Sequence, residues 1–510
     1  MKKTTMTVVF ATVAAAAFAD VKVSRMFSDS MVLQRGRPVP VKGTADPGEN
    51  VVVTFGEAKA SAKAGADGRF RVVLPAMNAD AKGRELKVAG RNEVVFKDVL
   101  VGDVWLVSGQ SNAEMSFRSG VLKGKETAAE AKDYPNIRAI KFNHEKATFP
   151  NRDTPCNKGP WKVVNQWTIN DVTAAGYFMA REINAKTGIP VGILDDNWSG
   201  CQIEPFICSE GMALVPDFAA QLKTVMESRD ALAGWCARVA SLRESGEYWK
   251  AGAQPAVGHW TTQHNAMIEP IVDFPIAGAV WYQGCSNGNE GMSYARKLEA
   301  LIGGWRAKWG YDFPFYIVQL ASFQAKTSDP AGGNGYARIR NAMRIASQTI
   351  PKTGLVVAID IGNDRDIHPK NKYDVGCRLA RWALRDVYGE KDLVVSGPMF
   401  RALRIEGSRA RVCFDHVGSG LMAGEKGPDT PGVAPTPTPD GKLRGFAVAG
   451  ADKVWHWADA VIDGSDVVVS SKDVAAPVAV RYAHRANPMG DCNLYNREGL
   501  PASPFRTDSW

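Results

Sequence analysis

Residues 104–115, VWLVSGQSNAEM, hold the pattern that decides the fold. The apolar run 104–107 is typical of a buried strand, and a Gly-Gln-Ser-Asn turn and a helix-compatible stretch follow it. Two interpretations fit. One is an ordinary strand-to-helix turn, since Gly, Ser and Asn are common turn and N-cap residues. The other is a nucleophilic serine, Ser111, held on a tight turn, and the rest of the chain must decide between them.

The same alternation of strand and helix continues to about residue 390. Continuous apolar runs, which strands buried on both faces require, recur between polar segments. The segment 294–305 carries its apolar residues on one helical face and predicts a helix. Alternating strands and helices predict an α/β fold with a parallel sheet covered by helices on both sides. Besides 104–107, the expected strands are 191–194, 277–282, 315–320 and 355–359.

The segments on either side of this region have a different character. Residues 20–98 contain short β-rich runs separated by Asp-Gly and Pro-Gly turns, which predicts a small N-terminal β-sandwich. Residues 99–391 form the α/β domain, with a helical insertion at about 209–262. Short β runs return in 392–510, around a Pro/Thr-rich loop, and predict a C-terminal β domain.

The first 19 residues read as a secretory signal, with two lysines, an apolar middle and an Ala-x-Ala cleavage site. We therefore expect an exported protein, periplasmic or secreted. No later apolar run reaches the length of a membrane span. The formal net charge of +8 is spread along 510 residues without a Lys/Arg block, which argues against a nucleic-acid partner. The eight cysteines show no Cys-x-x-Cys pair, so no zinc site is indicated.

Ligands bind open α/β sheets at the carboxyl ends of the strands, so the residues that follow each strand matter most. Ser111 follows the first strand, and Gly200 follows the second. Gln283 and Asn287 follow the third. An acid and an imidazole follow the last strand, in the stretch DIGNDRDIHPKNK, residues 360–372. A hydroxyl, amide donors, an acid and a base are the parts of a hydrolase site.

A serine hydroxyl needs a base at neutral pH, and the chain has seven histidines. Only His368 lies after a core strand at the expected ligand edge, two residues beyond Asp366. His416 follows Asp415, but in the C-terminal β region. We expect the other histidines to be structural or on the surface.

The order of Ser111, with Asp366 and His368 close together near the end of the domain, differs from the common α/β-hydrolase layout. Ala113 also stands where a full Gly-x-Ser-x-Gly motif has its last glycine. The layout resembles that of SGNH hydrolases, and more closely the sialate O-acetylesterase family within them. The resemblance covers about residues 26–508 and rests on FSDSMVLQRGRPVPVKGTADPGE, GDVWLVSGQSNAEM, AVWYQGCSN, PFYIVQLASF, DIHPKNKYDVGCRLA and NLYNREGLPASPFRTD.

The resemblance implies a three-layer, flavodoxin-like α/β domain of the SGNH-hydrolase type, flanked by β-sandwich-like regions. It also implies that Ser111 is the nucleophile, His368 the general base and Asp366 the residue that orients it. Asp364 remains a rival for that last role, because SGNH enzymes more often have Asp-x-x-His. The implied oxyanion donors are the backbone N–H groups of Ser111 and Gly200, with a side-chain amide from Gln283 or Asn287.

The family likeness further implies an esterase that removes acetyl groups from sugar hydroxyls, with O-acetylated sialic acids as substrates. No metal or organic cofactor and no obligatory protein partner are implied. One alternative is an acetyl esterase acting on plant polysaccharides such as xylan or xyloglucan. The other is a carbohydrate-binding protein whose esterase domain is degenerate.

Three cysteines depart from the family pattern. Cys201 stands in WSGC where the family has WGGT, Cys285 in QGCS where it has QGES, and Cys377 in GCRLA where it has GRRLA. Cys201 and Cys285 both follow core strands at the ligand edge, so a disulfide between them is one expectation, which export permits. Two buried free thiols are the other, since unpaired cysteine packs as a small hydrophobe.

Overall fold

The computed structural model describes residues 20–152 and 155–510, so the predicted secretory signal lies outside the described residues. The centre of the structure is a sheet with the strand order β10-β9-β11-β8-β12-β13-β14. All neighbours along this path are parallel except β10, and the predicted parallel sheet is therefore confirmed. The strands are β8 (Glu93–Gly109), β9 (Ile137–Lys141), β10 (Lys162–Val163), β11 (Val191–Asn197), β12 (Gly278–Tyr282), β13 (Phe315–Val318) and β14 (Thr353–Val356).

Successive side chains of β12 point to opposite faces of this sheet and enter two different cores. Val280 and Tyr282 pack in the cluster that includes α3 and α8, whereas Ala279 and Trp281 pack in the cluster that includes α4, α6 and α7. Helices thus cover both faces, and the helix predicted at 294–305 is confirmed within a longer one. The helices of this region are α1 (Ser111–Glu114), α2 (Gly124–Glu130), α3 (Ala174–Thr187), α4 (Ser209–Leu214), α6 (Ser293–Trp309), α7 (Gly335–Thr349) and α8 (Lys372–Asp386).

The strand β8 joins the N-terminal strands to the central sheet. Its first part pairs antiparallel with β7, and its last part lies parallel between β11 and β12. The expected domain boundary at residue 98/99 therefore falls inside one continuous strand. Near this point Arg138 of β9 is buried and binds the carboxylate of Asp98 at 2.8 Å. The N-terminal strands are β1 (Lys22–Val23), β2 (Val32–Gln34), β3 (Val39–Thr44), β4 (Asn50–Phe55), β5 (Ala58–Lys63), β6 (Arg69–Leu74) and β7 (Asp80–Ala89).

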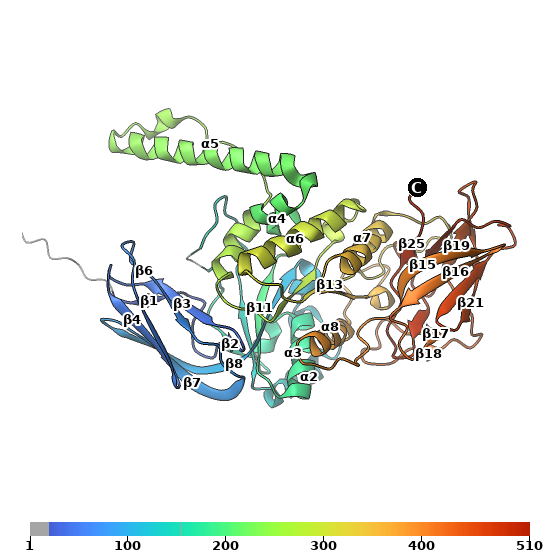
Figure 1. The fold of residues 1–510 in the computed structure, drawn as a ribbon, viewed down its shortest axis with the longest axis horizontal. Coiled ribbons are helices and arrows are strands. Elements are labelled where there is room, and N and C mark those ends of the chain that lie inside the picture. Colours follow the sequence, from blue (N-terminus) through green and yellow to red (C-terminus); the bar gives the residue numbers. More distant parts are fainter. Residues whose placement is uncertain (1–19, 153–154) are drawn as a thin grey trace, which may run out of the picture.

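The C-terminal region is built from antiparallel sheets, which lie beside α7 and α8 at the opposite end of the molecule from the N-terminal strands (Figure 1). The β-rich character expected on both sides of the α/β region is confirmed. The C-terminal strands are β15 (Met399–Glu406), β16 (Arg409–Asp415), β17 (Leu421–Glu425), β18 (Thr436–Pro437), β19 (Phe446–Ala449), β20 (Trp455–Trp457), β21 (Asp459–Asp463), β22 (Asp466–Ser470), β23 (Ala479–Tyr482), β24 (Leu494–Asn496) and β25 (Phe505–Arg506).

The segment between β11 and β12 is helical, as the sequence predicts. Its longest element, α5 (Ala219–Glu244), extends away from the body of the molecule in Figure 1. In residues 20–152 and 155–510, no helix is both long enough and apolar enough to span a membrane.

Candidate active site

Three of the predicted site segments start at the same edge of the sheet. Gly109, the last residue of β8, is in register with Asn197 of β11 and with Tyr282 of β12. The turns that follow these strands therefore begin side by side, as expected from parallel pairing. Gly109 has φ 143°, and a Cβ atom there would lie 2.3 Å from the Tyr282 carbonyl oxygen, so only glycine allows this close approach.

Ser111 and His368 meet at this edge. Ser111 is the first residue of α1, directly after the Gly109 turn, and its Oγ lies 2.8 Å from Nε2 of His368. His368 comes from the loop between β14 and α8, more than 250 residues further along the chain. The structure thus brings together the hydroxyl and the imidazole that sequence analysis paired, at hydrogen-bond distance.

Asp366 is the carboxylate beside this imidazole. Its Oδ1 lies 3.3 Å from Nδ1 of His368 and also accepts the backbone N–H of His368 at 2.8 Å. Partial burial opposes its ionisation, but the hydrogen bond from the His368 backbone and the Lys370 ammonium hold the pKa of Asp366 below its usual value. Asp364 is exposed, and within the described ranges no hydrogen bond or ion pair joins it to His368. The geometry therefore favours Asp366 over Asp364.

Two residues that sequence analysis did not single out connect the two halves of the site. Asn112 donates from Nδ2 to the carbonyl of Ile367 at 3.0 Å, and its Oδ1 accepts from Nζ of Lys372 at 2.6 Å. Lys372 is fully buried, and burial lowers the pKa of its ammonium to about 7. These contacts tie the residue after Ser111 to the loop that carries His368. Both residues lie in quoted motifs, GQSN and HPKNK, but only the fold shows that they meet.

Two of the predicted oxyanion donors keep free N–H groups. Gly200 lies in the turn after β11, with φ 74°, and Ser111 opens a helix, where backbone N–H groups have no intrahelical acceptor. In the part of the chain that the structure describes, neither N–H donates a hydrogen bond to another residue. Both are therefore available to a bound oxygen.

The side-chain amides offered as a third donor are occupied elsewhere. Nε2 of Gln283 donates to the Cys201 carbonyl at 3.0 Å and to Oδ1 of Asn287 at 2.8 Å. Nδ2 of Asn287 donates to the carboxylates of Glu204 at 3.1 Å and Glu290 at 2.7 Å. Both amides are buried with their hydrogens used, so they brace the turns around the site rather than face Ser111.

All eight cysteines are free thiols in the structure. The disulfide considered between Cys201 and Cys285 is therefore absent, and the alternative of separate thiols is the one observed. Sγ of Cys201 lies 3.6 Å from the Gly109 carbonyl oxygen, which places this thiol against the turn before Ser111. Burial raises the pKa of both thiols, so they remain protonated and act as packing groups.

Glu114, at the end of α1, fixes the turn that carries Gly200. Its Oε2 accepts the backbone N–H of Ser199 at 2.8 Å and the Ser199 hydroxyl at 2.6 Å. Its Oε1 lies 2.9 Å from Nε2 of His144, whose ring stacks on Trp198 with centroids 4.9 Å apart. A single carboxylate thus links the helix of Ser111, the turn of Gly200 and the segment of His144.

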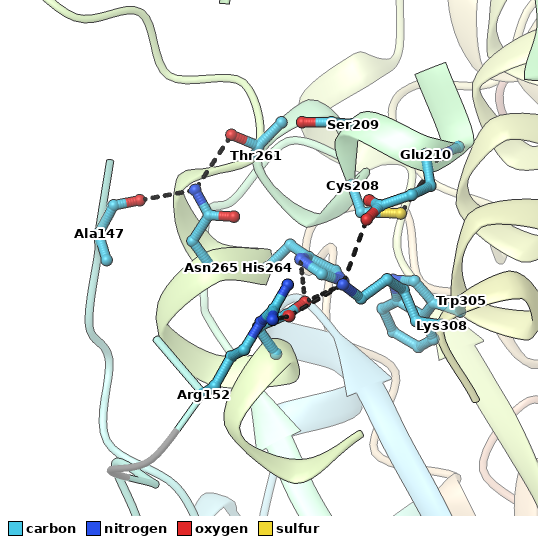
Figure 2. A network of polar contacts seen from close by, with 12 residues as sticks. Ala147, Arg152, Cys208, Ser209, Glu210, Thr261, His264, Asn265, Trp305 and Lys308 are labelled. Atoms are coloured by element: carbon cyan, nitrogen blue, oxygen red, sulfur yellow. Dashed lines mark hydrogen bonds and ion pairs between the residues drawn. The ribbon is translucent and has the colours of Figure 1, made fainter. Parts of the chain in front are cut away.

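The segment of His144 is itself anchored by a polar network around the buried residues Asn265 and Glu269 (Figure 2). Nδ2 of Asn265 donates to the carbonyls of Ala147 at 3.1 Å and of Thr148 at 2.8 Å. Further along the same segment, Arg152 binds Glu269 at 3.3 Å. These contacts hold the chain immediately after His144 against the helical segments that precede β12.

Comparison with known proteins agrees with this architecture. A family model described as "Carbohydrate esterase, sialic acid-specific acetylesterase" matches residues 241–385. The chain is similar to a sialate O-acetylesterase from Rattus norvegicus, 27% identical over 338 residues that make up 60% of each chain. It is also similar to the Homo sapiens protein of the same name, 26% identical over 73% of this chain and 72% of that one. The chain thus spans about 60% of the length of the rat relative.

One solved structure is similar over almost the whole molecule. It is a carbohydrate acetylesterase from Xanthomonas citri, 35% identical, with a TM-score of 0.80, and the match covers 96% of this chain and all of the other. With this identity over nearly the whole chain, the protein belongs to the same family of carbohydrate esterases as this acetylesterase, and the matched family model and curated relatives are sialic acid-specific acetylesterases and sialate O-acetylesterases.

Proposed function

We propose that this chain is an exported serine esterase that removes O-acetyl groups from sugars, with O-acetylated sialic acids as its substrates. The observation that carries the proposal is the 2.8 Å contact between Oγ of Ser111 and Nε2 of His368. Family membership supports the choice of an acetylated carbohydrate. Export rests on the signal pattern of residues 1–19.

In the proposed mechanism, His368 accepts the Ser111 proton while Oγ attacks the acetyl carbonyl. The tetrahedral intermediate collapses when the sugar oxygen leaves with the proton from His368, and an acetyl-serine remains. Water then attacks this ester with His368 again as the base, which releases acetate and restores the hydroxyl. Asp366 holds the imidazole through Nδ1 and stabilises its positive charge.

The developing oxyanion is bound by the backbone N–H groups of Ser111 and Gly200 in this proposal. Donors aimed at the developing charge are usually the largest single contribution to such a reaction. Gln283 and Asn287 have a positioning role in this proposal, since their hydrogen bonds hold the chain next to Gly200 in place. For Gln283 to act as a direct donor, its hydrogen bond to Cys201 or to Asn287 would have to break, and for Asn287 the bond to Glu204 or to Glu290.

The finer architecture belongs to the same proposal. We assign residues 99–391 to a three-layer domain of the SGNH type, residues 20–98 to an N-terminal β-sandwich and residues 392–510 to a C-terminal β domain. The helices on both faces of the parallel strands support the first assignment. Because β8 runs through residue 98, we propose that the N-terminal unit is fused to the catalytic sheet rather than linked to it flexibly.

The test is a graded series of esters. Hydrolysis of an aryl acetate would show whether the protein has esterase activity. Rates on acetylated sialic acid and acetylated xylan, measured side by side, would show which acetylated sugar it prefers. We expect the higher kcat/KM for acetylated sialic acid. Preference for xylan would transfer the function to plant polysaccharides, and no hydrolysis of any ester would leave a carbohydrate-binding protein with an inactive esterase domain.

A further inference from the structure

Lys372 lies in an unfavourable place for a cation. It is the first residue of α8, where the positive end of the helix dipole repels positive charge, and its side chain is fully buried. No carboxylate in the described ranges lies within ion-pair distance of its ammonium. A buried charge without a counter-charge is costly, and departures of this kind from local rules are expected at functional positions.

The other lysine that is buried in the described chain shows the usual arrangement. Lys297 of α6 forms ion pairs with two carboxylates. The ammonium of Lys372 instead donates to Oδ1 of Asn112 at 2.6 Å and lies 5.2 Å from the centre of the Tyr282 ring. The face of an aromatic ring stabilises a cation, but it does not accept a directed hydrogen bond from a single N–H group as an oxygen does. Asn112 is therefore the directed partner of this ammonium among the described residues.

The ammonium fixes the direction in which the Asn112 amide points. An ammonium only donates hydrogen bonds, so the amide must present its oxygen to Lys372 and its NH₂ group to its other neighbour. That neighbour is the Ile367 carbonyl, which accepts from Nδ2 at 3.0 Å. Asn112 directly follows Ser111, and Ile367 directly precedes His368. The amide thus joins the residue beside the hydroxyl to the residue beside the imidazole.

Few hydrogen bonds hold the loop of His368 against α1. Side-chain oxygens of this loop accept backbone N–H groups of the loop itself, and residues 363–365 are exposed. Apart from the contact of Ser111 with His368, the bond from Asn112 to Ile367 is the hydrogen bond that joins α1 to this loop in the described part of the chain. The hydrogen bonding that aligns Oγ with Nε2 therefore passes through one amide, whose direction one ammonium fixes.

We propose that Lys372 is a positioning residue for the reaction at Ser111: through Asn112, it holds the loop of His368 where Nε2 can accept the Ser111 proton. The effect on the reaction rests on the proposed esterase function, whereas the hold on the loop can be tested without it. Misplacement of a reacting group by about 1 Å can slow a reaction about 10²-fold. Because the contact aligns reacting groups and does not bind the substrate, its loss should change kcat rather than KM.

The experiment compares kcat and KM for aryl acetate hydrolysis by variants of the full-length protein. Lys372→Met keeps a long side chain and removes the donor. We expect kcat to fall about 10- to 10²-fold, with KM changed less than about twofold. Asn112→Ala should give a similar fall, and the double variant should lose no more than the slower single variant, because both changes remove the same connection. An unchanged kcat in Lys372→Met, or losses that multiply in the double variant, would overturn the proposal.

Two further variants separate positioning from stability. Leu379→Ala opens a cavity further along the same helix, so it should lower the melting temperature while kcat stays within about twofold of the unchanged protein. A fall in kcat as large as that of Lys372→Met would assign the lysine to stability alone and overturn the proposal. If Lys372→Met fails to fold, Asn112→Asp keeps an oxygen for the ammonium and loses the donor to the Ile367 carbonyl. Its kcat should fall by the same factor, and an unchanged kcat would overturn the proposal.

A structural measurement keeps this inference separate from the esterase proposal. Between crystal structures of the unchanged protein and of Lys372→Met, the separation of Oγ of Ser111 from Nε2 of His368 should increase from 2.8 Å to beyond about 3.5 Å. If the unchanged protein hydrolyses no ester, the esterase proposal fails, while this displacement still tests the hold on the loop. An unchanged separation in the variant would overturn the inference even in an active enzyme.

Discussion

At the scale of single residues, the proposed mechanism makes the reactivity of Ser111 depend on how well His368 is oriented. The imidazole and its carboxylate are both open to solvent, with side-chain exposures of 37% for His368 and 42% for Asp366. Water therefore screens the attraction between them more than in a triad whose acid is buried. In the proposed mechanism the main task of Asp366 is then geometric, since it would hold Nδ1–H and leave Nε2 free to accept the Ser111 proton.

This argument predicts an intermediate loss for Asp366→Asn. We expect kcat for aryl acetate hydrolysis to fall about 10²- to 10³-fold, less than the roughly 10⁴-fold loss known for a buried triad acid. Asp364→Asn removes the same charge two residues away and should change kcat less than about twofold, because Asp364 does not contact the imidazole. Steady-state kinetics of the two variants compare the roles directly. A larger loss in Asp364→Asn would move the orienting role to that residue.

At the scale of elements, the site depends on three turns that different strands deliver to one edge. The turn after β11 is exposed at Ser199 and Gly200, and Gly200 has a left-handed conformation. Glu114 of α1 compensates by accepting two hydrogen bonds from Ser199. The helix that begins at Ser111 thus fixes the turn that carries Gly200, the proposed oxyanion donor.

Loss of this connection should slow the reaction without unfolding the protein. We expect Glu114→Ala to lower kcat about 10- to 10²-fold, somewhat less than removal of an oxyanion donor outright, and Glu114→Gln to lower it less, because a side-chain oxygen still accepts the Ser199 bonds. Glu126→Ala, at an exposed position of α2, is the matched control and should behave like the unchanged enzyme. Equal activity in Glu114→Ala and the control would mean that the turn of Ser199 and Gly200 keeps its position without Glu114.

The strands and the edge of the site were predictable from sequence because continuous apolar runs and the residues after them depend on local pattern. The strand β9 was missed because its sequence, IRAIK, carries Arg138, whose charge is offset by Asp98, a residue 40 positions away. The boundary predicted at 98/99 from the change of pattern falls inside β8, where Asp98 has φ 54° and binds Arg138. The amides of Gln283 and Asn287 lie at the expected edge, but the groups that occupy them, the Cys201 carbonyl and the Glu204 carboxylate, come from another segment.

At the scale of the whole molecule, two neutral histidines make the fold sensitive to acid. His264 and His484 are buried in different regions, and burial, followed by neighbouring cations, lowers the pKa of each to about 3. In the unfolded chain the same groups titrate near 6.5. The unfolded state therefore binds more protons between these values, so the stability present above about pH 6.5 is lost as the pH falls toward 3.

Over this range, each such histidine changes the free energy of unfolding by at most about 1.4 kcal/mol per pH unit. His264→Gln should lower the pH dependence of the free energy of unfolding between pH 6.5 and 4 by up to that amount, since no proton is then taken up on unfolding at this position. The exposed His259→Gln should leave the slope unchanged. Denaturant unfolding at several pH values measures both, and identical slopes for the two variants would show that His264 is protonated in the folded protein.

The central claim is that Ser111 forms the acyl-enzyme, and the most direct measurement is the rate of aryl acetate hydrolysis by Ser111→Ala. We expect kcat to fall by about 10⁴-fold or more, with an unchanged melting temperature, because the hydroxyl makes no contact that the fold needs beyond His368. Ser119→Ala, at an exposed position a few residues further on, is the control and should keep full activity. Near-normal turnover by Ser111→Ala would contradict the account.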